Sequence, residues 1–175
     1  MDGRGNRENA TTAMMEFTRP ATWEDVKTLA RYLGEAGVDY ALVGGYAIAA
    51  HGFNRFSEDI DILVNPAAEN SIRWIAALSR LPDAAAAELA TEQDVFADDK
   101  RYAIRINDEF TIDVMPSIAG FSWDEMKVHI TTISIDDVTI NLLDLPGLLK
   151  TKQGVRPKDQ MDAAVIAAAL KNADR

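Results

Sequence analysis

The chain contains no cysteine, which excludes disulfide bonds, thiolate metal sites and cysteine nucleophiles. It also lacks any apolar stretch long enough to span a membrane, and its N-terminus has no apolar segment of signal-peptide length. Positive charge is scarce: 18 lysines and arginines stand against 28 aspartates and glutamates, for a net charge of −10. Because binding to nucleic acid depends on neutralising phosphates, long-range attraction is not expected to drive such binding. We expect a cytoplasmic protein without membrane association.

Length and periodicity predict one folded domain preceded by a polar arm. Residues 1–20 are polar and show no periodicity, so we expect a flexible arm there. Residues 21–175 are numerous enough to bury a sizeable core, and we expect them to form a single domain. Within them, segments with helical spacing of apolar residues are mixed with segments of two-residue period. This mixed order predicts an α/β or α+β fold, in which helices pack on a sheet.

Apolar residues recur at helical spacing in five segments. The first has a signal at each end, because Thr22 and Asp25 form a capping box at its start and Gly37 is a stop. The predicted helices cover residues 22–37, 66–81, 84–90, 144–153 and 157 onward. The residues expected on the buried sides of the second and last helices are Ile72, Trp74, Ile75 and Leu78, and Met161, Ala164, Val165, Ile166 and Ala168.

Alternation of apolar and polar residues predicts two β-hairpins and two further strands. The turn of one hairpin lies at residues 107–109, and Asp136 and Asp137 form the turn of the other. The expected strands cover residues 40–43, 58–64, 101–106, 110–115, 128–135 and 138–142.

The strand predicted at residues 58–64 separates acidic from aliphatic side chains. Because side chains alternate between the faces of a strand, Asp59, Asp61 and Leu63 share one face and the other aliphatic residues face the core. Two neighbouring carboxylates repel each other unless a positive charge lies between them, and a divalent metal ion is the obvious candidate. Their spacing of about 6.6 Å suits carboxylates that grip two metal ions about 3.5–4 Å apart. The competing interpretation is a solvent-facing edge strand with its charges outward.

A glycine pair and a third carboxylate complete the candidate site. Gly44 and Gly45 follow a short apolar strand and precede one or two helical turns at residues 46–51, so their backbone N–H groups can approach a phosphate. The alternative for this pair is a plain tight turn. Asp113 lies on the polar face of a later strand, and it can join Asp59 and Asp61 if the two strands are neighbours.

The spacing of these residues resembles the signature of the polymerase-β-like nucleotidyltransferase superfamily. That signature is a hydrophobic residue and two glycines, a gap of thirteen residues, and Asp-hydrophobic-Asp-hydrophobic. Further similarities are Arg55-x-Ser57, Asp113, and the segment Lys152…Arg156-x-Lys158-Asp159-x-x-Asp162. The last segment looks most like the small bacterial members akin to abortive-infection toxins. The resemblance extends over most of residues 23–170 and implies the mixed sheet of the nucleotidyltransferase fold, flanked by helices.

The resemblance implies a role for each matching residue. Gly44 and Gly45 would hold the triphosphate of an NTP. Asp59, Asp61 and Asp113 would bind two Mg²⁺ ions, and Asp113 would act as, or position, the base that takes the proton of the acceptor hydroxyl. The candidates for further phosphate contacts are Arg55, Ser57 and Lys152. The implied reaction is magnesium-dependent transfer of a nucleoside monophosphate to that hydroxyl, with loss of pyrophosphate.

Two features depart from related patterns. The glycine pair is not followed by the Ser/Arg pattern of the minimal nucleotidyltransferase antitoxins, which disfavours that subgroup. Asp113 is followed by Val-Met-Pro and not by another acidic residue, so the third carboxylate is alone on its strand.

The sequence does not decide between several acceptors and partners. An RNA acceptor, particularly a tRNA 3′ end in a toxin-like enzyme, is favoured by the basic C-terminal segment. A small hydroxylated molecule, as in lincosamide or aminoglycoside resistance enzymes, is favoured by the acidic net charge. A cognate antitoxin is a possible protein partner. A third hypothesis is a catalytically idle module that binds nucleotide or a partner protein, although it would not need three repelling carboxylates.

Several residues also have structural interpretations. We expect His51 to hydrogen-bond and shape its loop and not to act in catalysis. Lys152 and Lys158 could form a solvated helix end, where cations suit the helix dipole. Asp159 and Asp162 are expected to cap the last helix or pair with Arg156.

Overall fold

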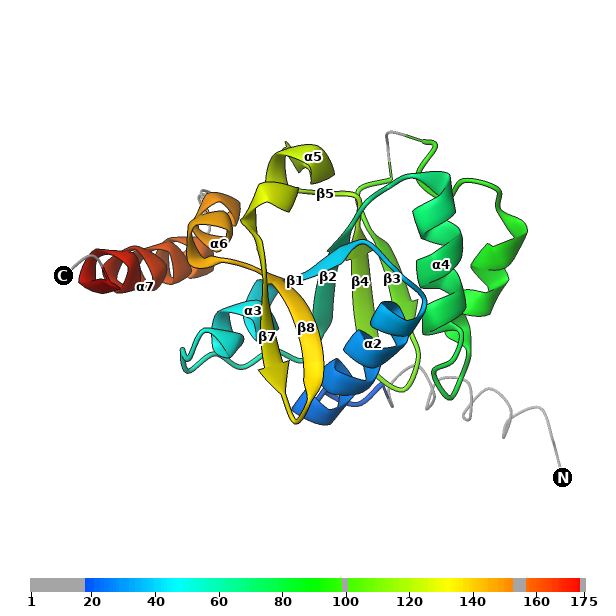
Figure 1. Ribbon diagram of the computed structural model, residues 1–175, viewed down its shortest axis with the longest axis horizontal. Coiled ribbons are helices and arrows are strands. Elements are labelled where there is room, and N and C mark those ends of the chain that lie inside the picture. Colours follow the sequence, from blue (N-terminus) through cyan, green and yellow to red (C-terminus); the bar gives the residue numbers. More distant parts are fainter. Residues whose placement is uncertain (1–17, 99–100, 153–156, 174–175) are drawn as a thin grey trace, which may run out of the picture.

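The computed structural model describes residues 18–98, 101–152 and 157–173. Its centre is a six-stranded mixed sheet (Figure 1). The six strands are β1 (Tyr40–Val43), β2 (Ile60–Val64), β3 (Ile104–Asn107), β4 (Thr111–Met115), β7 (Ile130–Ile135) and β8 (Val138–Leu143). Their order is β3-β4-β2-β1-β8-β7, with β2 parallel to β4 and β1 parallel to β8. Strands β5 (Ser117–Ile118) and β6 (Phe121–Ser122) form a separate small hairpin.

Two helices pack against each other over one face of the sheet, in front of it in Figure 1. The helical elements are α2 (Trp23–Glu35), α3 (Gly44–Ala50), α4 (Ala68–Leu78), η1 (Ala85–Thr91), α5 (Trp123–Met126), η2 (Lys127–His129), α6 (Leu145–Thr151) and α7 (Pro157–Ala173). Helix α2 packs on the apolar face, where its Leu29 and Leu33 line the same interior gap as Ile60 and Ile62 of β2. Across the residues that the structure describes, no helix is long and apolar enough to cross a bilayer.

Most of the predicted elements are confirmed. Helix α2 begins at the capping box of Thr22 and Asp25, and Gly37 follows it with a φ of +68°. Both predicted hairpins, β3–β4 and β7–β8, are present. At the turn of the second hairpin Asp136 and Asp137 have φ of +49° and +66°, the left-handed values that a two-residue type I′ turn requires.

Some boundaries and exposures were predicted wrongly. Strand β3 begins at Ile104, three residues later than predicted, and β2 and β7 begin at Ile60 and Ile130, each two residues later. The segment predicted as a helix at residues 84–90 is the 3₁₀ helix η1. Ile72, expected on the buried side of α4, is exposed. Leu63 shares a face with Asp61 but is fully buried, because β5 lies against β2 on this face.

The largest error concerns α7. Met161 and Val165, expected in the core, are 70% and 47% exposed, and Ala164 and Ala168 beside them are exposed too. Ile166 is buried as expected. The helix instead turns its acidic side inward, because carboxylates there pair with Lys152, directly after α6, and with Arg55 in the loop before β2. Arg156, the partner expected from the sequence, lies outside the described residues.

The N-terminal arm was predicted for residues 1–20, of which 1–17 lie outside the described residues. Arg19, within the described part, donates its backbone N–H to the carbonyl of Glu109 and pairs with Asp25. The segment directly before α2 is therefore tied to the folded domain.

Candidate active site

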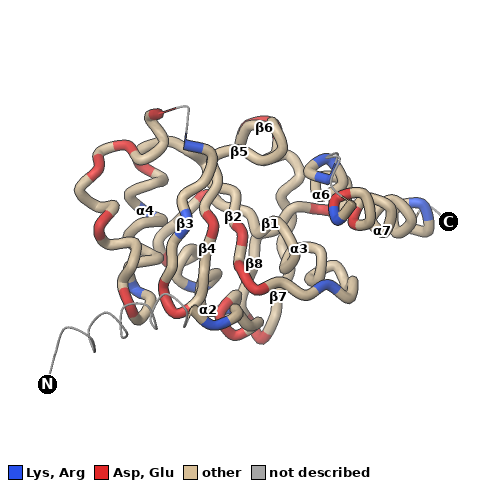
Figure 2. Tube along the Cα trace, turned by 180° about the vertical axis from the view of Figure 1, so that it is seen from behind, with Lys and Arg blue, Asp and Glu red and all other residues tan. Residues whose placement is uncertain are grey.

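Three carboxylates lie on one face of the sheet, where β2 and β4 run side by side. The parallel register places Asp61 directly beside Asp113, so both side chains point to the same face. Asp59 precedes β2 by one residue, and its carboxylate lies close enough to share a partner with Asp113. Figure 2 shows the acidic segments of β2 and β4 next to each other. The condition set by the sequence, that the two strands be neighbours, is met.

The carboxylate of Asp61 is held in an unfavourable environment. Burial, which is the largest cause, and the negative charges of Asp113 and Asp59 together raise its pKa to about 7. The ammonium group of Lys152 opposes the shift. Near neutral pH this carboxyl group therefore holds its proton about half of the time, unless a cation approaches it.

Gly44 and Gly45 allow the backbone to come close to the carboxylates. Gly44 has a φ of +70°, and a side-chain carbon there would collide with Oδ2 of Asp61. A side-chain carbon on Gly45 would lie 2.7 Å from Cβ of Ser57. Helix α3 starts at these glycines, and the residue before them, Val43, has no side-chain oxygen with which to cap their N–H groups.

Arg105 of β3 was not singled out from the sequence, and it neutralises part of the acidic cluster. Its Nε and Nη2 donate to the two carboxylate oxygens of Asp113 at 3.0 and 3.1 Å, and Nη2 lies 3.5 Å from Oδ2 of Asp59. These carboxylates raise the pKa of Arg105, so its charge is permanent. The side chain is 60% exposed. Arg105 could have been predicted as a site residue from the register of the β3–β4 hairpin, which pairs it with Asp113.

A second charged cluster lies on the opposite side, between α6, α7 and the loop before β2. Nζ of Lys152 is 3.5 Å from Asp159 and 3.2 Å from Asp162, and Nε of Arg55 is 3.4 Å from Asp162. All four side chains are largely buried. Nε of Arg55 and Oδ2 of Asp162 have no hydrogen-bond partner within the described part of the chain, so ion pairing holds them.

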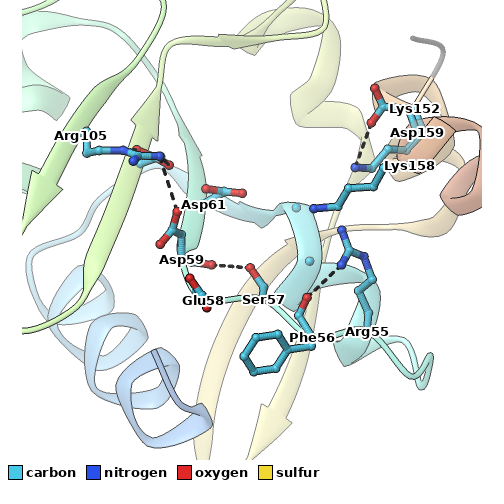
Figure 3. A pocket seen from close by; sticks show the side chains of 13 residues that line it. Arg55, Phe56, Ser57, Glu58, Asp59, Asp61, Arg105, Lys152, Lys158 and Asp159 are labelled. Atoms are coloured by element: carbon cyan, nitrogen blue, oxygen red, sulfur yellow. Dashed lines mark hydrogen bonds and ion pairs between the residues drawn. The ribbon is translucent and has the colours of Figure 1, made fainter. Parts of the chain in front are cut away.

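One cleft brings all the predicted site residues together (Figure 3). It has a volume of about 670 Å³. Its walls include every residue predicted from the sequence: Gly44, Gly45, Arg55, Ser57, Asp59, Asp61, Asp113 and Lys152. His51 is not among the lining residues, and its Nε2 lies 2.9 Å from the carbonyl oxygen of Leu143, which fits the structural role expected for it.

The cleft also contains residues without a predicted role in the site. Phe56 and Glu58 belong to the loop before β2, and Asp159 belongs to the second cluster. Lys158, which could have been a solvated helix end, extends its ammonium group from α7 toward the cleft (Figure 3). No ion pair of Lys158 is found among the residues with described positions. Its position depends on how α7 packs, which no local pattern in the sequence indicates.

The acidic cluster fits a divalent cation in its chemistry. The three carboxylates offer only oxygen donors, which Mg²⁺ prefers. The raised pKa of Asp61 and the attraction of Arg105 to Asp113 and Asp59 both show that positive charge is favoured at this place. Among the described residues, no three acidic or histidine side chains are already converged around a common point. A bound ion would therefore require the carboxylates to rotate and Arg105 to share or leave its partners.

Two comparisons with known proteins give matches. The family model for "Nucleotidyl transferase AbiEii toxin, Type IV TA system" matches residues 27–168. The crystal structure of an antigenic nucleotidyltransferase-like protein from Paracoccidioides brasiliensis is similar, with a TM-score of 0.50 and 17% sequence identity over 84% of this chain and 77% of that chain. At this identity the likeness concerns the fold, and the predicted mixed sheet flanked by helices is confirmed. A comparison with curated proteins finds no match.

Proposed function

Because the chain belongs to the AbiEii family of nucleotidyltransferase toxins and is thus a transferase, we propose that it moves a nucleoside monophosphate from an NTP to an acceptor hydroxyl at the cleft described above. The observation that carries this proposal is the in-register placement of Asp61 beside Asp113, next to the Gly44–Gly45 turn.

The glycine turn and the basic side of the cleft bind the triphosphate. The N–H groups of Gly44 and Gly45 lie at the start of α3, where Val43 offers no side-chain cap, so they can donate to phosphate oxygens. Ser57 packs directly on Gly45, and Arg55 and Lys152 add positive charge on the same side. These groups also stabilise the charge that develops on the pyrophosphate as it leaves.

The acidic side of the cleft handles the acceptor hydroxyl. Asp113 accepts the proton of this hydroxyl as it attacks the α-phosphate, and Arg105 orients the carboxylate through its two hydrogen bonds. Asp59, Asp61 and Asp113 would hold Mg²⁺, as two ions, which when bound supplies charge neutralisation on the attacking and leaving oxygens. The raised pKa of Asp61 supports this role, because a carboxylate that is difficult to ionise is strongly stabilised by a bound cation.

We propose RNA as the acceptor, in particular the 3′ end of a tRNA, and a cognate antitoxin as the protein partner. The support is the toxin description of the family and the ammonium group of Lys158, which lines the cleft, has no ion pair among the described residues and can pair with a phosphate of the RNA backbone. A cytoplasmic location would supply both NTPs and tRNA. A small hydroxylated molecule is the second candidate, favoured by the net charge of −10.

Label transfer tests the function and separates the acceptors. The protein is incubated with each α-³²P-labelled NTP and Mg²⁺, together with total RNA, cell protein or a panel of hydroxylated antibiotics. We expect label in RNA. Label in an antibiotic would indicate an antibiotic-resistance nucleotidyltransferase instead. Absence of transfer to every acceptor, together with absence of Mg²⁺-dependent NTP binding by calorimetry, would refute the enzymatic assignment in favour of a regulatory module.

Asp61→Ala is the decisive variant in this assay. We expect it to lose label transfer by at least about a hundredfold, since a charge-stabilising group of the transition state is removed. Asp124→Ala is the matched control, because Asp124 is an exposed acidic residue of α5 whose one ion pair among the described residues is with Lys127. Transfer that persists in Asp61→Ala at the native rate would contradict the assignment of the carboxylates.

A further inference from the structure

Strand β7 lies at one end of the six-stranded sheet, where β8 is its neighbour (Figure 1). All six residues of β7 pair with β8 in one antiparallel register. The hairpin closes on a two-residue turn, so Ile135 and Val138 form the hydrogen-bonded pair beside it, and such pairs alternate along the strand. The backbone N–H and C=O groups of Ile130, Thr132 and Ser134 therefore point away from β8, toward the free edge.

This free edge has none of the features that usually keep an edge strand from pairing. β7 reads Ile-Thr-Thr-Ile-Ser-Ile, without a charged residue or a proline, and its pairing with β8 contains no bulge. Within the described part of the chain, no other element hydrogen-bonds to its outward backbone groups. The opposite edge is different, because β3 has four residues and carries the charged Arg105. β7 is thus a template to which a further strand can add.

Apolar side chains at this end of the sheet are incompletely covered. Ile133 lies on the helix side of β7, since it pairs with Ile140, which lines an interior gap together with residues of α2. Ile135 shares that side. Both isoleucines are only partly buried, and Val128 of η2, just before β7, is 75% exposed. A strand added to the edge would cover the outer side of these residues.

We propose that β7 pairs antiparallel with β7 of a second copy of the chain, which gives a symmetric dimer. A twofold axis perpendicular to the sheet relates the two copies, because this operation reverses the strand direction and keeps each face on its own side. Two six-stranded sheets then form one continuous sheet, with Ile133 and Ile135 of both copies together on its helix side. Residues of β7 do not line the active-site cleft, so the inference is independent of the proposed function.

The charges at the two ends of β7 favour a second copy as the occupant of the edge. In an antiparallel pair, the end of one strand lies beside the beginning of the other. The turn after β7 is acidic, and its Asp137 is exposed and has no ion pair among the described residues. The segment before β7 contains Lys127, which is 53% exposed and paired with Asp124 of its own α5. Self-pairing therefore brings Asp137 of each copy to Lys127 and Val128 of the other.

Sedimentation velocity of the full chain, from about 5 to about 200 µM, tests for this dimer. We expect a reversible change from the mass of one chain to that of two, with a Kd on the order of 10 µM, because a single strand pair is a small interface. Asp137→Asn should weaken the dimer about threefold, since it removes one charge pair at each end.

Thr132→Lys is the main variant, because it sets two lysines side by side at the paired edge. We expect it to weaken the dimer at least about twentyfold. Thr139→Lys is the matched control: Thr139 pairs with Ser134 from β8, so the same charge is added on the same face but away from the edge. This control should dimerise like the native protein. Thr132→Pro is a second variant, which removes an outward N–H without a bond to β8 and should also be a monomer of native circular dichroism.

Spin labels locate the contact surface in the dimer. The chain has no cysteine, so a single introduced cysteine carries a nitroxide at a defined place. Labels on Ser134→Cys should lie within about 20 Å of each other. Labels on Tyr102→Cys are the control, because Tyr102 is 76% exposed and lies just before β3 at the far edge. Their expected separation is roughly 50 Å.

The exposed apolar side of α7, with Met161 and Val165, is the rival surface. A dimer that persists in Thr132→Lys but is lost in Val165→Lys would overturn the inference in favour of α7. Labels at Ser134 that are no closer than those at Tyr102 would overturn it as well. A native chain that stays monomeric at about 200 µM would show that β7 does not bind a second copy.

Discussion

The two charged clusters that border the cleft differ in their balance. On the α6–α7 side, two cations, Lys152 and Arg55, face two anions, Asp159 and Asp162, in a buried arrangement. On the β2–β4 side, three carboxylates face one cation, Arg105, which is largely exposed. Both clusters lie at the same cleft, but only the cluster on the β2–β4 side has a net charge, which is negative.

The difference indicates two separate uses of buried charge. In the balanced cluster the charges pair with one another and fix α7 against the domain, while Arg55 and Lys152 also line the cleft. An unbalanced cluster weakens the fold and is relieved by a cationic ligand, as the raised pKa of Asp61 indicates. Stability and binding should therefore respond in opposite directions to substitutions in the two clusters.

The largest effect on stability is expected from breaking the balanced cluster. Asp162→Ala leaves the cations Arg55 and Lys152 with one carboxylate between them in a buried place. We expect a loss of about 3 kcal/mol in the free energy of unfolding, because removing one partner of a buried ion pair leaves an uncompensated charge. Urea unfolding followed by circular dichroism measures it. The control Asp124→Ala should change the free energy of unfolding by less than about 0.5 kcal/mol. An equally small loss in Asp162→Ala would show that the cluster does not hold α7 against the domain.

The opposite sign is expected in the unbalanced cluster. The folded pKa of Asp61, about 7, lies well above its ordinary value of 3.8, so the unfolded chain releases this proton first as the pH rises. Ionisation of Asp61 thus lowers stability progressively between about pH 4 and 7, and the whole cost is present above that range. Asp61→Asn should raise the free energy of unfolding by about 2 kcal/mol at pH 8 while abolishing transfer.

The gain in Asp61→Asn should shrink steadily as the pH falls toward 4, where the native carboxyl group is protonated in both states. Thermal melts across pH 4.5–8 without metal measure this trend. A constant difference across the range would mean that the effect comes from packing and not from charge.

The same comparison shows what could be read from the sequence. Asp59, Asp61, Gly44 and Gly45 were predictable because strand alternation and a glycine turn are local properties, and their spacing matches a known signature. Asp113 needed one further assumption, that its strand lies beside β2, and the parallel register satisfies it. All of them line one cleft.

Features set by pairing between distant segments were not predictable. Arg105 joins the site only through the β3–β4 register, and Lys158 only through the direction in which α7 leaves the domain. Helix α7 carries an apolar stripe that by periodicity should be buried, as at Met161. The pairing of Asp159 and Asp162 with cations on other elements decides its orientation instead.

The smallest effect concerns the one cation of the acidic cluster. Arg105→Gln removes a positive charge that competes with a metal ion for Asp113 and Asp59. We expect Mn²⁺, used as a paramagnetic substitute for Mg²⁺, to bind about fivefold more tightly without nucleotide, a modest gain because solvent and salt screen an exposed guanidinium. Electron paramagnetic resonance of free Mn²⁺ measures the affinity, and Arg101→Gln, in an exposed arginine paired with Glu92, is the control. Since the effect is electrostatic, the gain in Mn²⁺ affinity should diminish at 0.5 M salt. Weaker Mn²⁺ binding in Arg105→Gln would contradict this prediction, because it would mean that the arginine holds the carboxylates in position for the ion and does not compete with it.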